Sequence, residues 1–317
     1  METKLTEKNK AGFYEIRMES IGGLGANLAG KMLAEAGILK QGLNGSAFSS
    51  YGSEKKGSPI RTFVRFCDPE TEVRINSPIE EPHLLVIFHE NLIKSLPVTE
   101  GVNDDSIVIV NTKKKPQEMR DILKLHAGRV GTVDALGIAI DEKVKLNTTM
   151  LGAITKASGF LDMEMVKDAI KDTLGKRYAH LLDANLRAFD RGYNELLIEE
   201  FSPDDRYSYI PFKRQTPQLG YKNAPIGGVI VNPGNTIAKD LSSSRSGFIP
   251  VFDKDKCINC GECDTTCPDF CFVWEKGLDK RGKPSQVLTK IDYRYCKGCM
   301  RCVEICKTAA LTPQKEV

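Results

Sequence analysis

The first 256 residues of this 317-residue chain contain a single cysteine, Cys67, although the whole chain contains ten. The other nine lie between Cys257 and Cys306, so the composition changes abruptly late in the chain. A chain of this length has room for about two domains. We therefore expect a domain boundary shortly before Cys257.

Long hydrophobic runs are also missing. The longest purely apolar run covers residues 84–88, far below the roughly 20 residues that a membrane-spanning helix needs. The first ten residues mix lysine with glutamate and lead into no apolar segment, unlike a secretory signal. These absences predict a cytoplasmic protein without a membrane span.

Histidine is scarce, and its positions do not suggest catalysis. Four histidines lie far apart along the chain: His83, His89, His126 and His180. His89 and Glu90 lack the second histidine of an H-E-x-x-H zinc motif. No Ser/His/Asp set or carboxylate pair stands out, so we expect structural histidines and no catalytic residue in this chain.

Eight of the late cysteines form two copies of one spacing, C-x2-C-x2-C-x3-C, offset by 39 residues. This is the ligand pattern of ferredoxins with two [4Fe–4S] clusters, in which the last cysteine of each motif binds the other cluster. We expect that last cysteine to open a helix that points its thiolate at the neighbouring cluster. The predicted ligands are Cys257, Cys260, Cys263 and Cys306 for the first cluster, and Cys296, Cys299, Cys302 and Cys267 for the second. Zinc and disulfide frameworks fit this spacing less well.

Two of the differences between the copies bear on cluster binding. Pro268 follows the first copy, whereas Lys307 follows the second, so the second lacks the fixed φ of proline. Cys271 stands where the second copy has Ala310. We expect both clusters to load, and Cys271 to be a small buried residue rather than a ligand.

The charged residues near the two copies also differ. Near the first copy are Asp253, Asp255, Glu262 and Asp264 against Lys254 and Lys256, and near the second are Arg294, Lys297 and Arg301 against Glu304. Because positive surroundings favour the reduced cluster, the second cluster is predicted to have the higher potential. Two clusters of about two negative charges each would also cancel the formal net charge of +3, so nucleic-acid binding is not expected.

The first two-thirds of the chain predict an α/β sheet of Rossmann-like type. Residues 13–19 alternate as a strand, followed by a glycine turn at Gly22, Gly23 and Gly25 and by a helix over residues 31–36. Further strands are expected at residues 60–67, 84–89, 107–111 and near 130, and helices at 117–126, 163–174 and 178–198. The turn is a poor dinucleotide fingerprint, because Leu28 replaces the third glycine.

The expected organisation is therefore an α/β domain at residues 1–198, an irregular arm at 199–245 and an α+β two-cluster ferredoxin domain at 246–317. Residues 201–250 hold six prolines and no sustained period. An arm that drapes over partner subunits is the favoured interpretation, and a flexible linker is the alternative. Within the ferredoxin domain, residues 272–275 and 286–291 flank a turn-rich stretch and predict a hairpin.

Three stretches resemble the γ part of 2-oxoacid:ferredoxin oxidoreductases. Residues 47–59 are similar to its S-Y-G-x-E-[RK]-[RK]-G-x-P signature, residues 147–157 to a second signature, and residues 22–25 to its first glycine turn. Residues from about 235 onward resemble the δ part of the same enzymes. The resemblance suggests cofactor-binding or subunit-contact roles for Gly22, Gly23, Gly25, Tyr51, Gly52, Glu54 and Gly57.

This resemblance implies a non-catalytic electron-transfer subunit of an anaerobic enzyme. Thiamine pyrophosphate, Mg²⁺ and one further [4Fe–4S] cluster would belong to α and β subunits, in a dimer of heterotrimers, and external ferredoxin would accept the electrons. The fused γδ arrangement is most similar to the member that oxidises oxalate to CO2. Pyruvate or another 2-oxoacid with coenzyme A is the alternative, and a free iron–sulfur electron carrier with a nucleotide-binding domain is the alternative from another class.

Overall fold

The computed structural model describes residues 5, 7–51, 58–209, 211–213, 226–227, 240–245 and 247–316. The chain divides into two compact units, Met1–Lys213 and Arg214–Val317. The boundary expected after residue 198 falls inside a strand of the first unit, since Leu197–Phe201 pairs with the sheet. Most of the expected arm at residues 199–245 lies outside the described residues.

The first unit is built on a mixed seven-stranded sheet in the order β2-β3-β1-β4-β5-β6-β7. The strands are β1 (Tyr14–Ile21), β2 (Asn44–Tyr51), β3 (Pro59–Cys67), β4 (Leu84–Ile87), β5 (Ile107–Asn111), β6 (Gly128–Val133) and β7 (Leu197–Phe201). The central strands β1, β4, β5 and β6 run parallel, and β2, β3 and β7 are antiparallel to their neighbours. The sequences of β4 and β5 are almost entirely apolar because both faces of these strands are buried.

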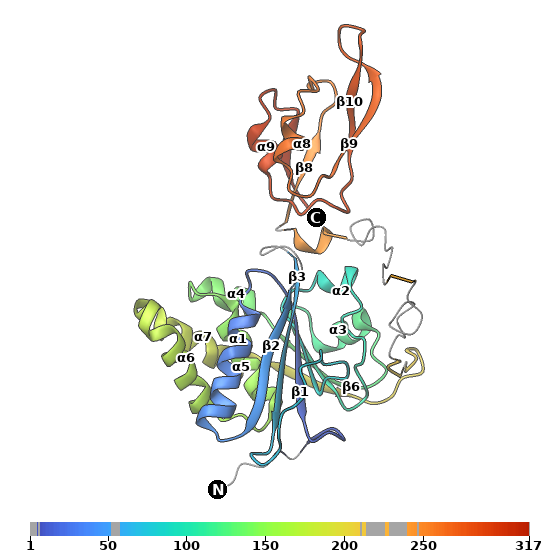
Figure 1. Cartoon of the computed structure of the whole chain (residues 1–317). Coiled ribbons are helices and arrows are strands. Elements are labelled where there is room, and N and C mark those ends of the chain that lie inside the picture. The colour runs from blue at the N-terminus through green and yellow to red at the C-terminus, as the bar shows by residue number, and fades with distance from the viewer. Residues whose placement is uncertain are drawn as a thin grey trace. The chain divides into compact units, whose positions relative to one another are not determined.

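Helices cover both faces of this sheet. They are α1 (Ala26–Ala34), α2 (Leu92–Ser95), α3 (Pro116–Leu123), α4 (Ala135–Asp141), α5 (Leu146–Ser158), α6 (Met163–Tyr178) and α7 (Leu182–Glu195). Figure 1 shows α1 and α4 to α7 on one face, and α2 and α3 on the other. Two separate hydrophobic clusters correspond to these two layers. The unit is therefore a three-layer α/β structure.

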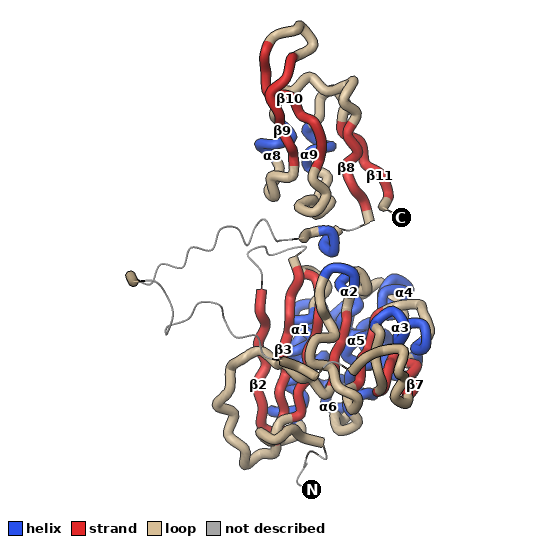
Figure 2. Tube along the Cα trace, turned by 90° about the vertical axis from the view of Figure 1, so that its right-hand side faces the viewer, coloured by secondary structure: helices blue, strands red, loops and turns tan. Residues whose placement is uncertain are grey.

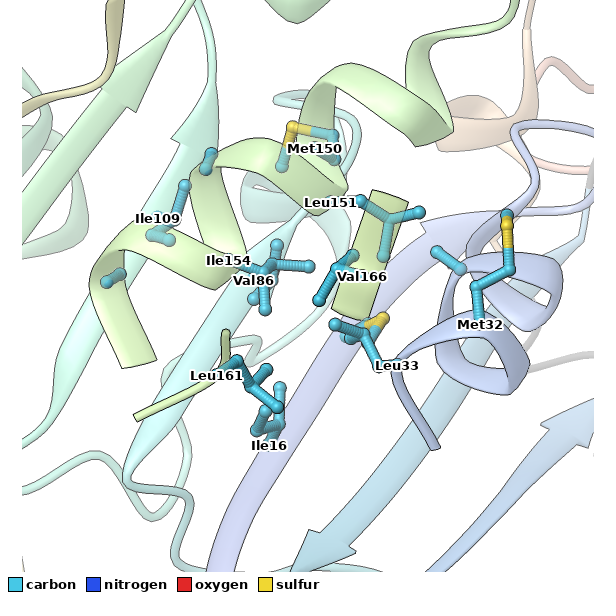
Figure 3. Close-up of a cluster of buried hydrophobic side chains, with 14 of the residues drawn as sticks. Ile16, Met32, Leu33, Val86, Ile109, Met150, Leu151, Ile154, Leu161 and Val166 are labelled. Atoms are coloured by element: carbon cyan, nitrogen blue, oxygen red, sulfur yellow. The ribbon is translucent and has the colours of Figure 1, made fainter. Parts of the chain in front are cut away.

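The larger cluster packs α1, α5 and α6 against the sheet, and Figure 3 shows Leu33, Leu151 and Val166 converging there. Helices α5 and α7 approach closely because each has a glycine at the contact. A Cβ atom added to Gly152 would lie 2.0 Å from the Phe189 carbonyl oxygen, and one added to Gly192 would lie 2.0 Å from the Thr149 carbonyl oxygen. Only glycine fits at either position without movement of the backbone.

Several elements differ from the sequence expectation. The helix expected over residues 178–198 is α7, which ends at Glu195 and is followed by β7. Strand β2 and helix α5 were not expected, although both lie in the stretches that carry the family signatures. Helix α1 begins at Ala26 and continues into a π-helical segment, Glu35–Lys40, whereas the sequence predicts a helix over residues 31–36 only.

The second unit contains two antiparallel strand pairs and two one-turn helices. Its elements are β8 (Phe248–Phe252), α8 (Glu262–Thr266), β9 (Phe272–Leu278), β10 (Pro284–Ile291), α9 (Arg301–Ile305) and β11 (Leu311–Lys315). Strand β8 pairs with β11 and β9 pairs with β10, which confirms the predicted hairpin. Helices α8 and α9 lie side by side (Figures 1 and 2). Among the described residues of both units, no helix is long and apolar enough to cross a membrane.

Candidate metal centre

Two cavities in the second unit are lined by cysteines. The first is lined by Cys257, Cys260, Cys263 and Cys306, and the second by Cys267, Cys296, Cys299 and Cys302 together with Cys271. Each cavity thus receives three cysteines from one sequence copy and the last cysteine from the other. This is the crossed grouping that the spacing predicts.

The backbone conformation repeats with the same offset as the cysteines. Residues with positive φ occur in pairs separated by the offset of the two copies: Asn259 (55°) and Gly298 (68°), Gly261 (77°) and Met300 (61°), Phe270 (48°) and Ala309 (51°). Side chains other than glycine rarely adopt this conformation. Because this conformation occurs at equivalent positions of the two copies, both loops fold in the same way around their cavities.

The last cysteine of each copy follows a helix and does not open one, contrary to the expectation. Helix α8 ends before Cys267 (φ −77°, ψ 116°), and α9 ends before Cys306 (φ −73°, ψ 99°). The two backbones agree closely although Pro268 follows one cysteine and Lys307 the other. Proline is therefore not needed to turn the chain after the second copy.

The cavities suit a group that carries positive charge and accepts hydrogen bonds. Burial raises the pKa of the Cys263 thiol to about 11 and that of Cys302 to about 12, so these thiolates need a nearby cation at neutral pH. Trp274 lines the first cavity, and its buried indole Nε1 has no hydrogen-bond partner within the described residues. Iron meets the first requirement, and the sulfide of an iron–sulfur cube can accept the indole hydrogen.

Cys271 is buried beside the second cavity, as expected, but it is not an isolated side chain. Only 4% of its surface is exposed, and its Sγ lies 3.4 Å from Sγ of Cys267. The hydrogen bond from Cys271 lowers the pKa of Cys267 to about 6. The contact stabilises this sulfur as a thiolate, the form in which cysteine binds iron.

The charges that line the cavities differ from those counted in the sequence. Glu262 and Lys307 line the first cavity, with an ion pair of 2.6 Å between them. Asp269, Lys297 and Arg301 line the second, and Lys297 lies 3.2 Å from the buried Asp269. Of the charged residues in the sequence count, only Glu262, Lys297 and Arg301 line a cavity. The surplus of positive charge at the second cavity is smaller than the sequence suggests, but its sign is the same.

Arg245 is a further cation near the second cluster site that sequence reasoning missed. Its side chain is 8% exposed, and its Nε donates to the Cys296 carbonyl oxygen at 2.9 Å. It also pairs with Glu316 and donates to the Tyr293 carbonyl oxygen. The residue lies in the segment assigned to the arm and within the stretch that resembles the δ part, but no charge near the cluster was predicted from it.

In the first unit, the glycine turn joins the carboxyl end of β1 to α1. Gly23 and Gly25 have φ of 111° and 87°, and the Gly22 amide donates to the Ser58 carbonyl oxygen at 2.9 Å. A Cβ atom at Gly25 would lie 3.0 Å from Asn147, so the turn packs on the start of α5. The structure thereby brings the first and last of the three family-like stretches together.

The remaining candidate residues lie in the middle family-like stretch, residues 47–59. Tyr51 ends β2 with 57% of its surface exposed, and it pairs across the sheet with Ile60. Gly52, Glu54 and Gly57 lie outside the described residues. The geometry of Tyr51 assigns it no ligand role.

Comparison with known proteins identifies both units. Residues 15–195 match the family model "Pyruvate ferredoxin/flavodoxin oxidoreductase", and residues 249–307 match "4Fe-4S dicluster domain". The "Pyruvate/ketoisovalerate oxidoreductases common subunit gamma" of Thermococcus kodakarensis is 38% identical over 59% of this chain and 98% of its own length. The "Pyruvate synthase subunit PorC" of Thermotoga maritima is 37% identical over 59% of this chain and 97% of its own length.

A solved structure agrees with the sequence relatives. The crystal structure of the pyruvate oxidoreductase subunit PORC from Thermotoga maritima has a TM-score of 0.52 and 34% identity, covering 60% of this chain and 99% of that chain. The first family model spans more than half of the present chain. The chain therefore belongs to the pyruvate ferredoxin/flavodoxin oxidoreductase family, as a non-catalytic subunit of a 2-oxoacid oxidoreductase whose C-terminal unit carries two [4Fe–4S] clusters.

Proposed function

We propose that this chain conducts electrons from a 2-oxoacid active site in partner subunits, through its two [4Fe–4S] clusters, to external ferredoxin. The observation that supports this most is the crossed grouping of eight cysteines around two neighbouring cavities. Two cubes bound by interleaved motifs of one small domain lie close together, as a path for successive electron transfers requires.

We assign Cys257, Cys260, Cys263 and Cys306 to the first cluster, and Cys296, Cys299, Cys302 and Cys267 to the second. The two lining sets support this assignment. When bound, the clusters supply one-electron redox chemistry. The protein fixes the thiolates, donates hydrogen bonds and surrounds each cavity with a different set of charges.

In this proposal, the first unit is a Rossmann-like γ domain that packs on the catalytic subunits, and the segment that follows β7, up to residue 245, forms the arm that joins it to the ferredoxin domain. Thiamine pyrophosphate, Mg²⁺ and one further [4Fe–4S] cluster belong to α and β subunits, in a dimer of heterotrimers. The names of the relatives support such an assembly, since they describe γ subunits and a pyruvate synthase subunit. Gly22, Gly23 and Gly25 form a turn at the carboxyl end of a parallel strand, a position that suits subunit contact or cofactor binding.

Pyruvate is the favoured substrate, because the relatives are named for pyruvate and ketoisovalerate. Oxalate, expected from the fused arrangement of the two units, is the second candidate. Both would be oxidised in partner subunits, so this chain alone does not select between them.

The experiment is purification of the native protein under anaerobic conditions, followed by an assay of ferredoxin reduction. We expect the chain to co-purify with α and β subunits and to support ferredoxin reduction with pyruvate and coenzyme A. Reduction with oxalate in the absence of coenzyme A would identify the second candidate instead. A lone monomer that carries bound NAD or flavin would contradict the proposal and favour a free electron carrier.

A further inference from the structure

The two cluster sites differ at one internally matched position. Four residues after the last cysteine of each copy, the chain has Cys271 in one case and Ala310 in the other. Cys271 lines the second cavity and Ala310 lines the first. Both side chains are buried, with 4% and 2% of their surface exposed. The two matched positions therefore allow a comparison between a cluster site with a buried thiol beside it and a cluster site without one.

The geometry gives that thiol a partner. Sγ of Cys271 lies 3.4 Å from Sγ of Cys267. Cys267 is assigned above as a ligand of the second cluster. A cysteine that binds iron is a thiolate and has no hydrogen to donate. The S–H of this contact therefore belongs to Cys271.

We propose that Cys271 is a positioning residue that donates its S–H to a ligand sulfur of the second cluster, Sγ of Cys267, and raises the reduction potential of that cluster. The inference rests on the ligand sets of the proposed function. Reduction adds negative charge to the cube and its thiolates, so a donor to those sulfurs stabilises the reduced form more than the oxidised form. The first cluster has no such donor at Ala310, which is a second source of asymmetry besides the lining charges.

The test uses the full chain with both clusters loaded, in redox titrations followed by EPR. The variants are Cys271→Ala, which removes the donor, Cys271→Ser, which restores a hydroxyl donor, and Ala310→Cys, which adds a thiol at the matched position. We expect Cys271→Ala to lower the potential of the second cluster by about 59 mV, a tenfold change in the ratio of reduced to oxidised cluster. Cys271→Ser should recover part of that shift. Ala310→Cys should raise the potential of the first cluster.

The iron content of each variant distinguishes a packing role of Cys271 from a role as a cluster ligand. Unchanged potentials in Cys271→Ala and Ala310→Cys with full iron content would overturn it, because a residue with only a packing role gives that result. Loss of half of the iron in Cys271→Ala would also overturn it, by making Cys271 a ligand. A second cluster that survives replacement of Cys267 or Cys296, with Cys271 left in place, would overturn the ligand sets of the proposed function, and this inference with them.

Discussion

Replacing Arg301 with glutamine should lower the potential of the second cluster. Arg301 lines the second cavity together with Lys297 and Asp269, so the variant removes the surplus positive charge there. Lys297 pairs with Asp269, whereas Arg301 is exposed. The change therefore leaves no buried charge without its partner, and the fold should tolerate it.

The size of the effect follows from Coulomb's law. A unit charge roughly 8 Å from the cube contributes about 2 kcal/mol at an effective dielectric constant near 20, and about 0.5 kcal/mol in bulk water. For a one-electron couple these limits correspond to a shift of about 20 to 90 mV. Because Arg301 is exposed, we expect a value near the lower limit, decreasing further as salt is added.

The assay is a redox titration of the full chain, with each EPR signal assigned by disabling one set of cysteines. In the wild-type chain the second cluster should have the higher potential. The matched control is Lys307→Gln, which leaves the Glu262 carboxylate without its 2.6 Å partner at the first cavity and should lower the potential of the first cluster instead. A wild-type order with the first cluster higher, or an Arg301→Gln shift confined to the first cluster, would refute the electrostatic reasoning.

Three further predictions concern iron binding, fluorescence and stability. Cys306→Ser should empty the first cluster and Cys267→Ser the second, each with loss of about half of the iron and of one EPR signal; loss of the opposite signal would contradict the crossed ligation. Trp274 is the only tryptophan and lines the first cavity, so its emission should be quenched by the first cluster and increase in Cys306→Ser more than in Cys267→Ser; equal emission from the two variants would contradict this. Gly192→Ala should destabilise the first unit by about 3 kcal/mol in denaturant unfolding, because the new Cβ would lie 2.0 Å from a backbone oxygen. Gly175→Ala, whose Cβ would meet only Leu182 at 3.9 Å, is the control and should not destabilise, so equal losses would contradict the packing argument.

The cluster ligands are predicted from the sequence alone, because ligand spacing is a local property. A loop of C-x2-C-x2-C folds around one cube regardless of the rest of the chain, and the repeat implies the crossing. The grouping of eight cysteines in two cavities agrees with it. The hairpin of β9 and β10 could also be predicted from the sequence, since two strand-like segments flank a short turn.

Elements whose identity depends on tertiary packing were missed. Helix α5 is buried on nearly all sides, so its sequence shows no amphipathic period. Strand β2 forms one edge of the sheet and is rich in small and polar residues, which resemble a loop. Strand β7 follows α7 after a single residue, so the predicted helix over residues 178–198 overlaps its first two residues.

The charges around the clusters could not be read from sequence proximity either. Arg294 is close to Cys296 in sequence, but its side chain pairs with Asp292 and does not line the second cavity. Arg245 is far away in sequence and yet donates to the Cys296 carbonyl oxygen. Which charges reach a cluster depends on how the strands bring distant segments together.

The central claim, that electrons leave the enzyme through this chain, is tested most directly in the intact complex carrying Cys306→Ser. We predict that this complex, with its first cluster missing, loses reduction of ferredoxin by pyruvate. It should keep reduction of a small artificial acceptor that takes electrons from the partner subunits. Ferredoxin reduction at the wild-type rate, with the first cluster shown by EPR to be absent, would contradict the account.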